Sequence, residues 1–318
     1  MSRSRSGYFY IILSAVIFST MEVVLKTMHG VLAPMQITVL RFFAGGLLLL
    51  PFALRSMKEK GTTLRRADLP FFALTGFLCV VVSMSFYQTA VVSTRASVVA
   101  VIFSCNPIFV TVLAKPLLGE EIGRNHIAAL ALELLAVLII IDPLHASLDP
   151  TGALLAVAAA LFFALYSVVC KKRTARFGGI AVTCLSFLCG ASELLVVLLL
   201  GRTAAVGGAF RATGLALFAD VPILRGIPTS ALPALLYICA VVSAGGFVCH
   251  MMAVEKTSAR QASLVFFFKP ILAPIFAAIF LREEIAPNML LGIGCFLLGS
   301  GAAILPGLLE ERKRALRK

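Results

Sequence analysis

The sequence predicts an all-α integral membrane protein with ten transmembrane helices, arranged as two inverted five-helix repeats. Three observations predict this class. Of the 318 residues, 60% are hydrophobic and 14% are charged, whereas soluble proteins contain about 25% charged residues. Ten apolar segments long enough to cross the ~30 Å hydrocarbon core of a bilayer follow one another along the chain. The second half of the chain also repeats sequence features of the first half.

Each predicted helix is an apolar run of roughly 18 to 25 residues, which is the length that a membrane-spanning helix requires. The first run follows Arg3 and Arg5 and begins like a secretory signal. It is longer than such a signal and leads directly into a second span, so we expect it to remain as a helix. The predicted spans are 8–28, 34–54, 69–91, 96–118, 125–142, 150–170, 180–200, 231–254, 259–281 and 286–306.

The positions of the 28 Lys and Arg residues predict the orientation. When the N-terminus is placed in the cytoplasm, most of them fall in cytoplasmic segments, as the positive-inside rule requires. We therefore expect a multi-pass protein of the plasma (inner) membrane with both termini cytoplasmic. Anionic lipid at the inner leaflet explains the net charge of +13, so the lipid bilayer is the expected partner and nucleic acid is not.

Neither catalysis nor a cofactor is predicted. The eight cysteines fall in apolar segments and form no CxxC motif or Cys/His cluster with metal-ligand spacing, so we interpret them as buried free thiols. The chain lacks a Gly-rich GK loop, an HExxH motif and a GxSxG motif, which argues against ATP hydrolysis and against an embedded hydrolase.

An internal repeat divides the chain. With an offset of 163, residues 90–122 align without a gap with residues 253–285, and with an offset of 145, residues 38–45 meet residues 183–190. An odd number of helices in each copy inverts the second copy in the membrane, and inverted repeats are a common architecture of secondary transporters. We therefore predict one five-helix unit in residues 1–146 and a second in 147–318. The second unit carries a long outer loop, 201–230, and a basic cytoplasmic tail.

In both copies a proline inside a helix is followed near the helix end by a Glu pair. These are Pro107 with Glu120 and Glu121, and Pro270 with Glu283 and Glu284. Ten helices with these motifs resemble the EamA branch of the drug/metabolite transporter superfamily, and the resemblance covers residues 8–306. It implies transport, but similar members export amino acids, other metabolites or drugs. The chain has no tryptophan, although one is often seen in the opening helix of such proteins, so substrate detail does not carry over.

Glu22 lies in an otherwise apolar helix, about 9 Å from its nearer end, where a lone ionised carboxylate costs on the order of 3 kcal/mol. Its equivalent at an offset of 145 is Ser167. Arg41 lies at a similar depth in the second helix. Two interpretations stay open: Glu22 forms a structural pair with Arg41, or it lines a cavity and binds a substrate cation or a coupling proton. Lys26, aligned with Lys171 at a helix end, is expected to snorkel to the headgroups.

Lys269 lies about 15 Å into the ninth helix, near the midplane, where snorkelling cannot reach the headgroups. It aligns with Asn106, and both residues precede a proline. Lys269 either holds an anionic group of the substrate in a central cavity or forms a structural pair with Glu133 or Glu193. Backbone N–H groups are lost at prolines, so we expect helix breaks with a gating role at Pro107, Pro270 and Pro274.

Other polar and aromatic residues are candidates for the walls of the site, with packing as the alternative for each. They are Tyr87, Gln88, Tyr166, Ser167 and Phe266–Phe268. His250 could relay protons or be a satisfied interfacial histidine. The acidic pairs Glu120/Glu121 and Glu283/Glu284 are interpreted as helix-start charges or latch contacts.

The sequence therefore predicts a secondary transporter, and in particular an exporter of a small polar or zwitterionic metabolite such as an amino acid. Glu22, Arg41 and Lys269 offer both signs of charge to such a substrate. The alternatives are proton-coupled efflux of cationic drugs, a membrane-embedded enzyme or flippase for lipid substrates, and a scaffold without transport activity. The small, apolar helix at 286–306 also suits close packing or a homodimer.

Overall fold

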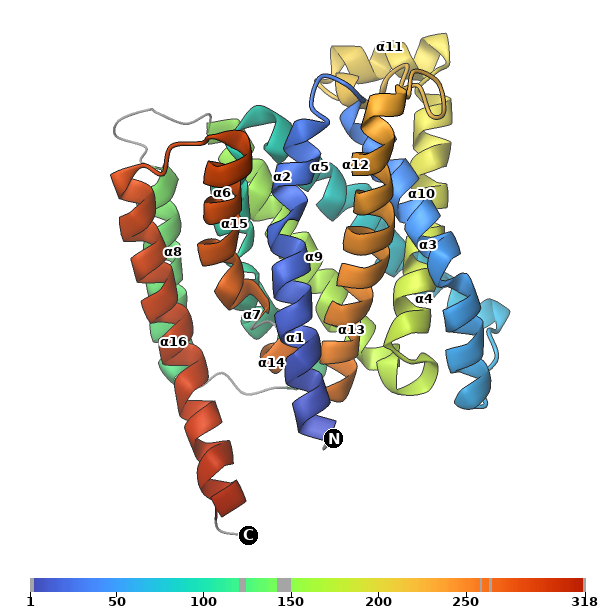
Figure 1. The fold of residues 1–318 in the computed structure, drawn as a ribbon. Helices are drawn as coiled ribbons and strands as arrows, with labels where there is room; N and C mark the ends of the chain where they lie inside the picture. The colour runs from blue at the N-terminus through green and yellow to red at the C-terminus, as the bar shows by residue number, and fades with distance from the viewer. Residues whose placement is uncertain (1–2, 120–123, 142–149, 258, 263–264, 317–318) are drawn as a thin grey trace.

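The computed structural model describes residues 3–119, 124–141, 150–257, 259–262 and 265–316. These residues form helices and turns, and none of them lies in a strand. Figure 1 shows the long helices side by side in one bundle. The helical segments long and apolar enough to cross a membrane are Ser6–Thr27, Pro34–Glu59, Arg66–Ser93, Ala96–Leu118, Pro150–Phe177, Gly179–Leu200 and Thr229–Lys256.

These seven segments confirm the all-α membrane class. The remaining predicted spans correspond to α8, α15 and α16. Shorter apolar stretches lie in α15 (Phe268–Leu281) and in α16 (Pro287–Gly299). The count of ten crossings stays a prediction.

The helices of the first predicted copy follow the predicted spans, and several spans consist of two or more helical pieces. They are α1 (Arg3–Ser19), α2 (Met21–Thr27), α3 (Pro34–Glu59), η1 (Arg66–Asp68), α4 (Leu69–Gly76), the π-helix η2 (Phe77–Ser83), α5 (Met84–Ser93), α6 (Ala96–Phe103), α7 (Asn106–Leu118) and α8 (Arg124–Ile141).

The second predicted copy is segmented in the same way in its third span. Its elements are α9 (Pro150–Phe177), α10 (Gly179–Leu200), α11 (Ala204–Ala212), η3 (Ala216–Phe218), η4 (Thr229–Ala231), α12 (Leu232–Leu236), the π-helix η5 (Tyr237–Gly246), α13 (Phe247–Lys256), α14 (Ala259–Ala262), α15 (Val265–Leu281) and α16 (Pro287–Leu316). Both third spans thus pass through a π-helical turn, a feature that is frequent near functional sites.

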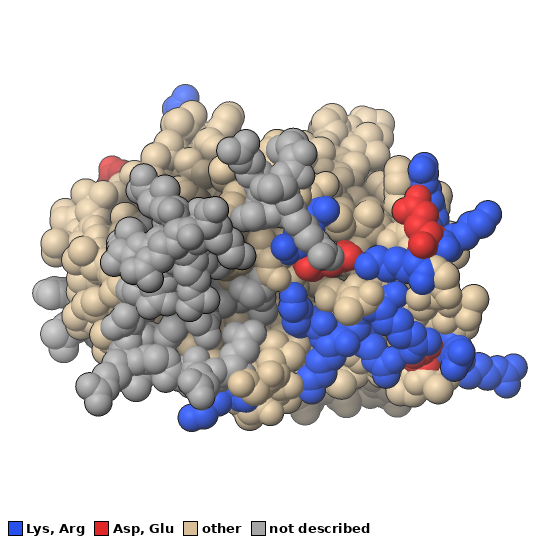
Figure 2. Space-filling view, turned by 90° about the horizontal axis from the view of Figure 1, so that it is seen from below, with Lys and Arg blue, Asp and Glu red and all other residues tan. Residues whose placement is uncertain are grey.

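The two ends of the bundle differ in charge. At the end where α1 begins and α16 ends, here called the basic end, Lys and Arg side chains gather in the view of Figure 2. Asp68 accepts hydrogen bonds there from Arg176 at 2.7 and 3.0 Å and from Arg173 at 3.3 Å. Lys60 and Glu255 form an ion pair at 2.8 Å. These pairs join the connection before α4 to α9, and α3 to α13.

The opposite end, here called the loop end, carries α11 (Figure 1). The predicted connection 201–230 between two spans contains a short helix, Ala204–Ala212. Thr203 caps the N-terminus of this helix, because its Oγ1 accepts a hydrogen bond from the backbone N–H of Val206 at 3.4 Å. Threonine is a favourable residue at this position.

Equivalent lysines in the two predicted copies make equivalent contacts. Lys26 Nζ donates to the carbonyls of Val91 and Thr94 at the end of α5, at 2.9 and 2.8 Å. Lys171 donates to the carbonyls of Val254 and Thr257 at the end of α13, at 2.6 and 3.3 Å. These two residues are the equivalents of Val91 and Thr94 at the offset of 163. The expectation that Lys26 snorkels to the headgroups is therefore wrong. Both lysines satisfy helix C-terminal carbonyls, which favour a cation.

Glycines allow two helices to approach closely at equivalent places. Gly190 of α10 packs against Gly76 of α4, and a Cβ atom at Gly190 would overlap the backbone of Gly76. Gly45 of α3, which aligns with Gly190, lies against Ser243 of η5, where an added Cβ would be 3.2 Å from the serine Cβ. Small residues at such crossings are typical of helix packing in membranes.

We expect Gly190→Ala to destabilise the protein, because the added methyl group must displace the backbone of Gly76. Overpacking of this kind costs about 1–3 kcal/mol. The matched control is Gly294→Ala in α16, where the added Cβ meets no atom of another described helix within 4 Å. Thermal unfolding in detergent would measure both variants, and an equal melting temperature for the two would contradict the close crossing.

The helix breaks differ in part from the prediction. The chain leaves helical conformation between α6 and α7, and Pro107 lies in the first turn of α7, where its missing N–H costs little. By contrast, α15 continues through Pro270 and Pro274, so the predicted breaks at these two residues are wrong. Neighbouring helices can compensate for the freed carbonyls of a proline-containing helix in a membrane.

Candidate substrate-binding site

A buried ion pair joins the two predicted copies in the middle of the bundle. Lys269 Nζ of α15 lies 2.5 Å from Oε1 of Glu22 in α2. The hydroxyl of Tyr87 in α5 donates to the same carboxylate oxygen and accepts from Lys269 Nζ at 3.4 Å. Glu22 is 1% exposed, and Lys269 and Tyr87 are fully buried. The three residues, here called the charged cluster, come from three different spans.

The pairing of Glu22 and Lys269 decides between the structural interpretations of both residues. The predicted Glu22–Arg41 pair is wrong, because Glu22 pairs with Lys269 and Arg41 has other neighbours. The predicted structural pair of Lys269 with Glu193 is also wrong. Glu193 forms no ion pair with Lys269 and its Oε2 has no hydrogen-bond partner, while the side chain of Glu133 lies outside the described residues.

Arg41 lies beside the charged cluster and is fully buried. Its Nη1 donates to Met21 Sδ at 3.4 Å, and its guanidinium carbon lies 4.5 Å from the ring centroid of Phe42. Arg41 interacts electrostatically with Glu22 and Tyr87. In the described chain neither Nε nor Nη2 of Arg41 has a hydrogen-bond partner. These two nitrogens form the side edge of the guanidinium, which can bind both oxygens of a carboxylate.

The buried charges do not balance within the described residues. Glu22 supplies one negative charge, and Lys269 and Arg41 supply two positive charges. Glu22 Oε1 is used by Tyr87 and Lys269, whereas its Oε2 has no described partner. A buried charge without a hydrogen-bonded counterion is costly. The site thus presents an acceptor oxygen and a positive bidentate edge that the described residues do not satisfy.

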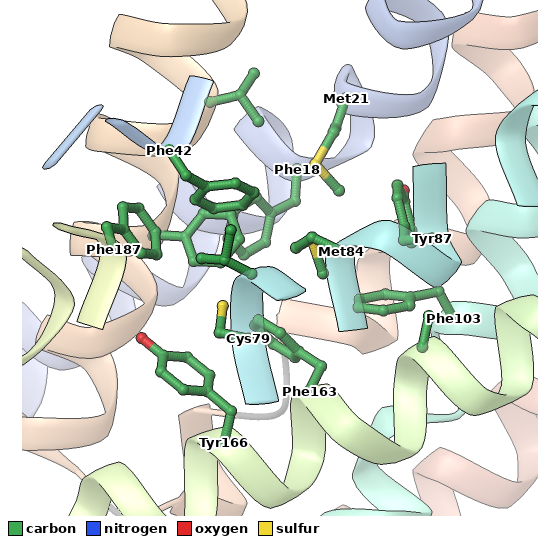
Figure 3. Close-up of a cluster of buried hydrophobic side chains, with 14 of the residues drawn as sticks. Phe18, Met21, Phe42, Cys79, Met84, Tyr87, Phe103, Phe163, Tyr166 and Phe187 are labelled. Atoms are coloured by element: carbon green, nitrogen blue, oxygen red, sulfur yellow. The ribbon is translucent and has the colours of Figure 1, made fainter. Parts of the chain in front are cut away.

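Aromatic rings from several spans lie close together in the core (Figure 3), and two of them lie beside Lys269. Lys269 Nζ lies 4.9 Å from the ring centroid of Phe103 and 5.4 Å from that of Tyr87. Phe103 in turn contacts Phe266 at 5.8 Å and Phe163 at 5.5 Å between centroids. Rings at this distance stabilise cations and pack a rigid wall. Tyr87 and Phe266, both predicted as wall residues, are therefore brought together with Lys269 and Glu22.

The remaining predicted site residues make no hydrogen bond to the charged cluster among the described contacts. Asn106 Nδ2 donates to the carbonyl of Ala160 in α9 at 2.9 Å, so its amide serves as a contact between spans. Tyr166 is fully buried and has Cys170 and Thr183 as polar neighbours. Ser167 is 3% exposed, and its hydroxyl has no hydrogen-bond partner in the described structure. Gln88 Oε1 also has no partner among these residues.

His250 of α13 was interpreted from the sequence as a proton relay or an interfacial histidine. The structure places it in the aromatic region, with ring centroids 5.6 Å from Phe163, 5.8 Å from Phe266 and 6.1 Å from Phe18. It is 2% exposed, and both ring nitrogens lack a hydrogen-bond partner within the described chain. The interfacial interpretation is therefore wrong, because a histidine at the headgroups would be hydrated.

One of the predicted latch contacts is present at the loop end. Glu283 accepts hydrogen bonds from the backbone N–H groups of Ala96 and Ser97 at 2.9 and 3.1 Å and from the Ser97 hydroxyl at 2.6 Å. A carboxylate at the N-terminus of α6 satisfies free N–H groups and interacts favourably with the helix dipole. Glu120 and Glu121 lie outside the described residues.

An apolar cavity of about 370 Å³ borders α2 and α15, the two helices that carry Glu22 and Lys269. Its lining includes Thr20, Val24, Tyr237 and Phe280. The described residues contain no group of three or more His, Cys, Asp or Glu side chains that could hold a metal ion.

Comparison with known proteins identifies relatives along almost the whole chain. Residues 5–142 and 150–304 match the model of the EamA-like transporter family. An uncharacterized transporter of Clostridium kluyveri is 35% identical over 93% of this chain and 92% of its own length. A probable terminal-alkyne amino-acid exporter of Streptantibioticus cattleyicolor is 28% identical over 79% of this chain and 76% of its own. A crystal structure with 16% identity shares the fold, with a TM-score of 0.62 over 96% of this chain and 97% of the other.

Proposed function

The chain belongs to the EamA-like transporter family, and from this premise we propose that it is a secondary transporter that exports a small zwitterionic metabolite, such as an amino acid, from the cytoplasm. In this proposal ten helices form two inverted repeats in the plasma membrane, and both termini and the basic end are cytoplasmic. Transport proceeds by alternating access, as is usual for inverted repeats. Either proton exchange or the gradient of the substrate itself drives it.

The observation that carries the substrate class is that two buried side chains of opposite charge, Glu22 and Arg41, each have polar atoms without a described partner. Arg41 offers Nε and Nη2, and Glu22 offers Oε2, all three without a described partner. A zwitterion places its carboxylate on the guanidinium edge of Arg41 and its ammonium group on Glu22 Oε2. This arrangement gives Arg41 and Glu22 a hydrogen-bonded partner of opposite charge. Because a zwitterion has no net charge, the net charge of the region does not change on binding.

The ion pair between Glu22 and Lys269 supplies a contact that can change during transport. Glu22 belongs to the first copy and Lys269 to the second, so relative movement of the copies stretches this bond. A substrate ammonium group that competes for Glu22 weakens the bond and favours the movement. The substrate thus makes different contacts in the two states, which is the condition for a ligand to shift a conformational equilibrium.

Two further facts support an amino-acid-like substrate over a cationic drug. Glu22 lies near two cationic side chains, Lys269 and Arg41. Their positive charges repel a purely cationic substrate, which has no carboxylate to pair with them. One relative is named an amino-acid exporter, and the family matches name transporters rather than enzymes. A lipid-substrate enzyme would require clustered catalytic groups at a membrane face.

Exchange of labelled amino acids by proteoliposomes tests the proposal. We expect uptake of a neutral amino acid to be competed by the unlabelled compound. We expect competition about 30-fold weaker from its amide, which lacks the carboxylate, and from its N-acetyl derivative, which lacks the ammonium group. Loss of one hydrogen bond to a buried charge costs about 1.5–3 kcal/mol, and about 2 kcal/mol corresponds to this factor.

Liposomes without protein give the background of this assay. If the carrier instead moves tetraphenylphosphonium or another lipophilic cation and no amino acid, the proposal is wrong and drug efflux takes its place. If the amide and the N-acetyl derivative compete as well as the parent amino acid, neither charge of the zwitterion is recognised.

A further inference from the structure

The charged cluster has an equivalent in the second copy. The offset of 163 that relates Phe103 to Phe266 also relates Tyr87 to His250 and Asn106 to Lys269, and the offset of 145 relates Glu22 to Ser167. The residues Ser167, His250 and Asn106 are here called the mirror cluster. Phe103 and Phe266 contact each other, with 5.8 Å between their ring centroids. Phe103 also packs against Tyr87 of the charged cluster at 4.8 Å, and Phe266 packs against His250 of the mirror cluster at 5.8 Å. This pair of rings therefore lies between the two clusters.

The two clusters differ in how far their polar atoms are satisfied. In the charged cluster the long side chains of Glu22, Tyr87 and Lys269 meet and bond to one another. The side chains of the mirror cluster are shorter. Asn106 bonds to a backbone carbonyl, while Ser167 Oγ and both nitrogens of His250 lack partners among the described residues.

Such a set of atoms is costly unless something binds it. A buried polar group without a hydrogen bond loses about 1–3 kcal/mol, and most buried polar groups in folded proteins have a partner. The rings of Phe18, Phe163 and Phe266 around His250 supply no conventional hydrogen-bond acceptor. The mirror cluster therefore offers one hydroxyl, one ring N–H and one ring nitrogen acceptor to a ligand.

We propose that His250 and Ser167 form a second subsite, which binds an uncharged hydrogen-bonding group on the side chain of the transported zwitterion. This inference rests on the function proposed above. A hydroxyl or amide group suits the subsite because it both donates and accepts, as do a neutral imidazole and a serine hydroxyl. A charged side chain does not suit it, because the described neighbours of His250 are aromatic.

Phe18 links the span that carries Glu22 to the ring of His250. Phe18 lies one helical turn before Glu22 on the same face of the first span, and its ring centroid is 6.1 Å from that of His250. One layer of aromatic rings thus separates the site for the charged groups from the mirror cluster. A short side chain that passes through this layer brings its polar end to His250 and Ser167.

The experiment compares amino acids of nearly equal shape that differ by a polar group: threonine with valine, and asparagine with leucine. Reconstituted wild-type protein should transport the polar member of each pair with at least tenfold higher kcat/KM, because a site built for hydrogen bonds rejects an apolar isostere. His250→Phe should abolish this preference while valine and leucine are still transported. His250→Gln retains a donor and an acceptor and should keep part of the preference.

His29→Phe is the matched control, since it makes the same chemical change at an exposed residue near the loop end. It should leave the preference of the wild type unchanged. Ser167→Ala should lower kcat/KM for threonine more than for valine and so reduce the preference, and this variant decides the question if His250→Phe does not fold.

The outcomes separate the two proposals. If wild-type protein transports amino acids but does not prefer the polar members, or if His250→Phe and Ser167→Ala keep the full preference, the subsite is wrong and the transport function stands. If wild-type protein transports no amino acid, the proposed function itself fails, together with the subsite that rests on it.

Discussion

Lys269→Met is expected to abolish transport and to destabilise the protein by about 3–5 kcal/mol, because it leaves the carboxylate of Glu22 buried without its counterion. In the native structure Lys269 is fully buried and lies 2.5 Å from Glu22. The hydrogen bond from Tyr87 remains in the variant, but one neutral donor does not compensate for a lost positive charge. Thermal unfolding in detergent and amino-acid exchange in proteoliposomes measure the two effects.

The double variant Glu22→Gln, Lys269→Met separates stability from transport. Removing both charges together is often neutral for stability or increases it, so we expect the melting temperature to recover while transport stays absent. Lys60→Met is the matched control, because its ion pair with Glu255 is partly exposed and such pairs contribute about 1 kcal/mol or less. Normal exchange by the double variant would contradict a role of the ion pair in transport.

Arg41→Gln is expected to reduce transport of carboxylate-bearing substrates about 100-fold while leaving the stability unchanged or increased. The direction of the stability effect is opposite to that for Lys269, because the Nε and Nη2 atoms of Arg41 have no described partner to lose. Removing an uncompensated buried charge relieves its desolvation cost. The glutamine amide cannot replace the two parallel charged hydrogen bonds to a carboxylate.

Arg41→Lys distinguishes charge from geometry. It keeps the positive charge and loses the bidentate edge, so its transport rate should lie between those of the wild type and Arg41→Gln. Arg55→Gln serves as the control, because Arg55 is exposed and pairs only with its helical neighbour Glu59 in the described structure. If Arg41→Gln unfolds the protein and an amide analogue still competes weakly, Arg41 is a structural residue and the carboxylate binds elsewhere.

Three of the residues that make the candidate site could be identified from the sequence because charges are rare in apolar helices. Glu22, Arg41 and Lys269 can be recognised on this ground alone, since burying each charge in a membrane costs free energy unless a partner compensates it. Their partners could not be identified in this way. Depth along a helix placed Glu22 beside Arg41, but the rotation and lateral position of each helix decide which side chains meet, and these depend on packing.

His250 shows a signal in the sequence that could have been used. The repeat offset that aligns Asn106 with Lys269 also aligns Tyr87 with His250, so a residue equivalent to a cluster member was already visible. Its burial among Phe18, Phe163 and Phe266 could not be inferred, because three different spans contribute these rings. Lys26 illustrates the opposite case: its position at a helix end suggested the headgroups, but the carbonyls at the end of α5 are its partners.

Composition and residue order were sufficient to predict a membrane environment, helical structure, an internal repeat and the family, because each of these properties can be read along one dimension. The EamA resemblance is confirmed by the family match over both copies. Helix packing in three dimensions pairs Glu22 with Lys269 and leaves Nε and Nη2 of Arg41 and both ring nitrogens of His250 without a partner among the described residues. The physical reason is that a buried charge accepts any partner of suitable sign and depth, and packing of the helices selects which one lies within reach.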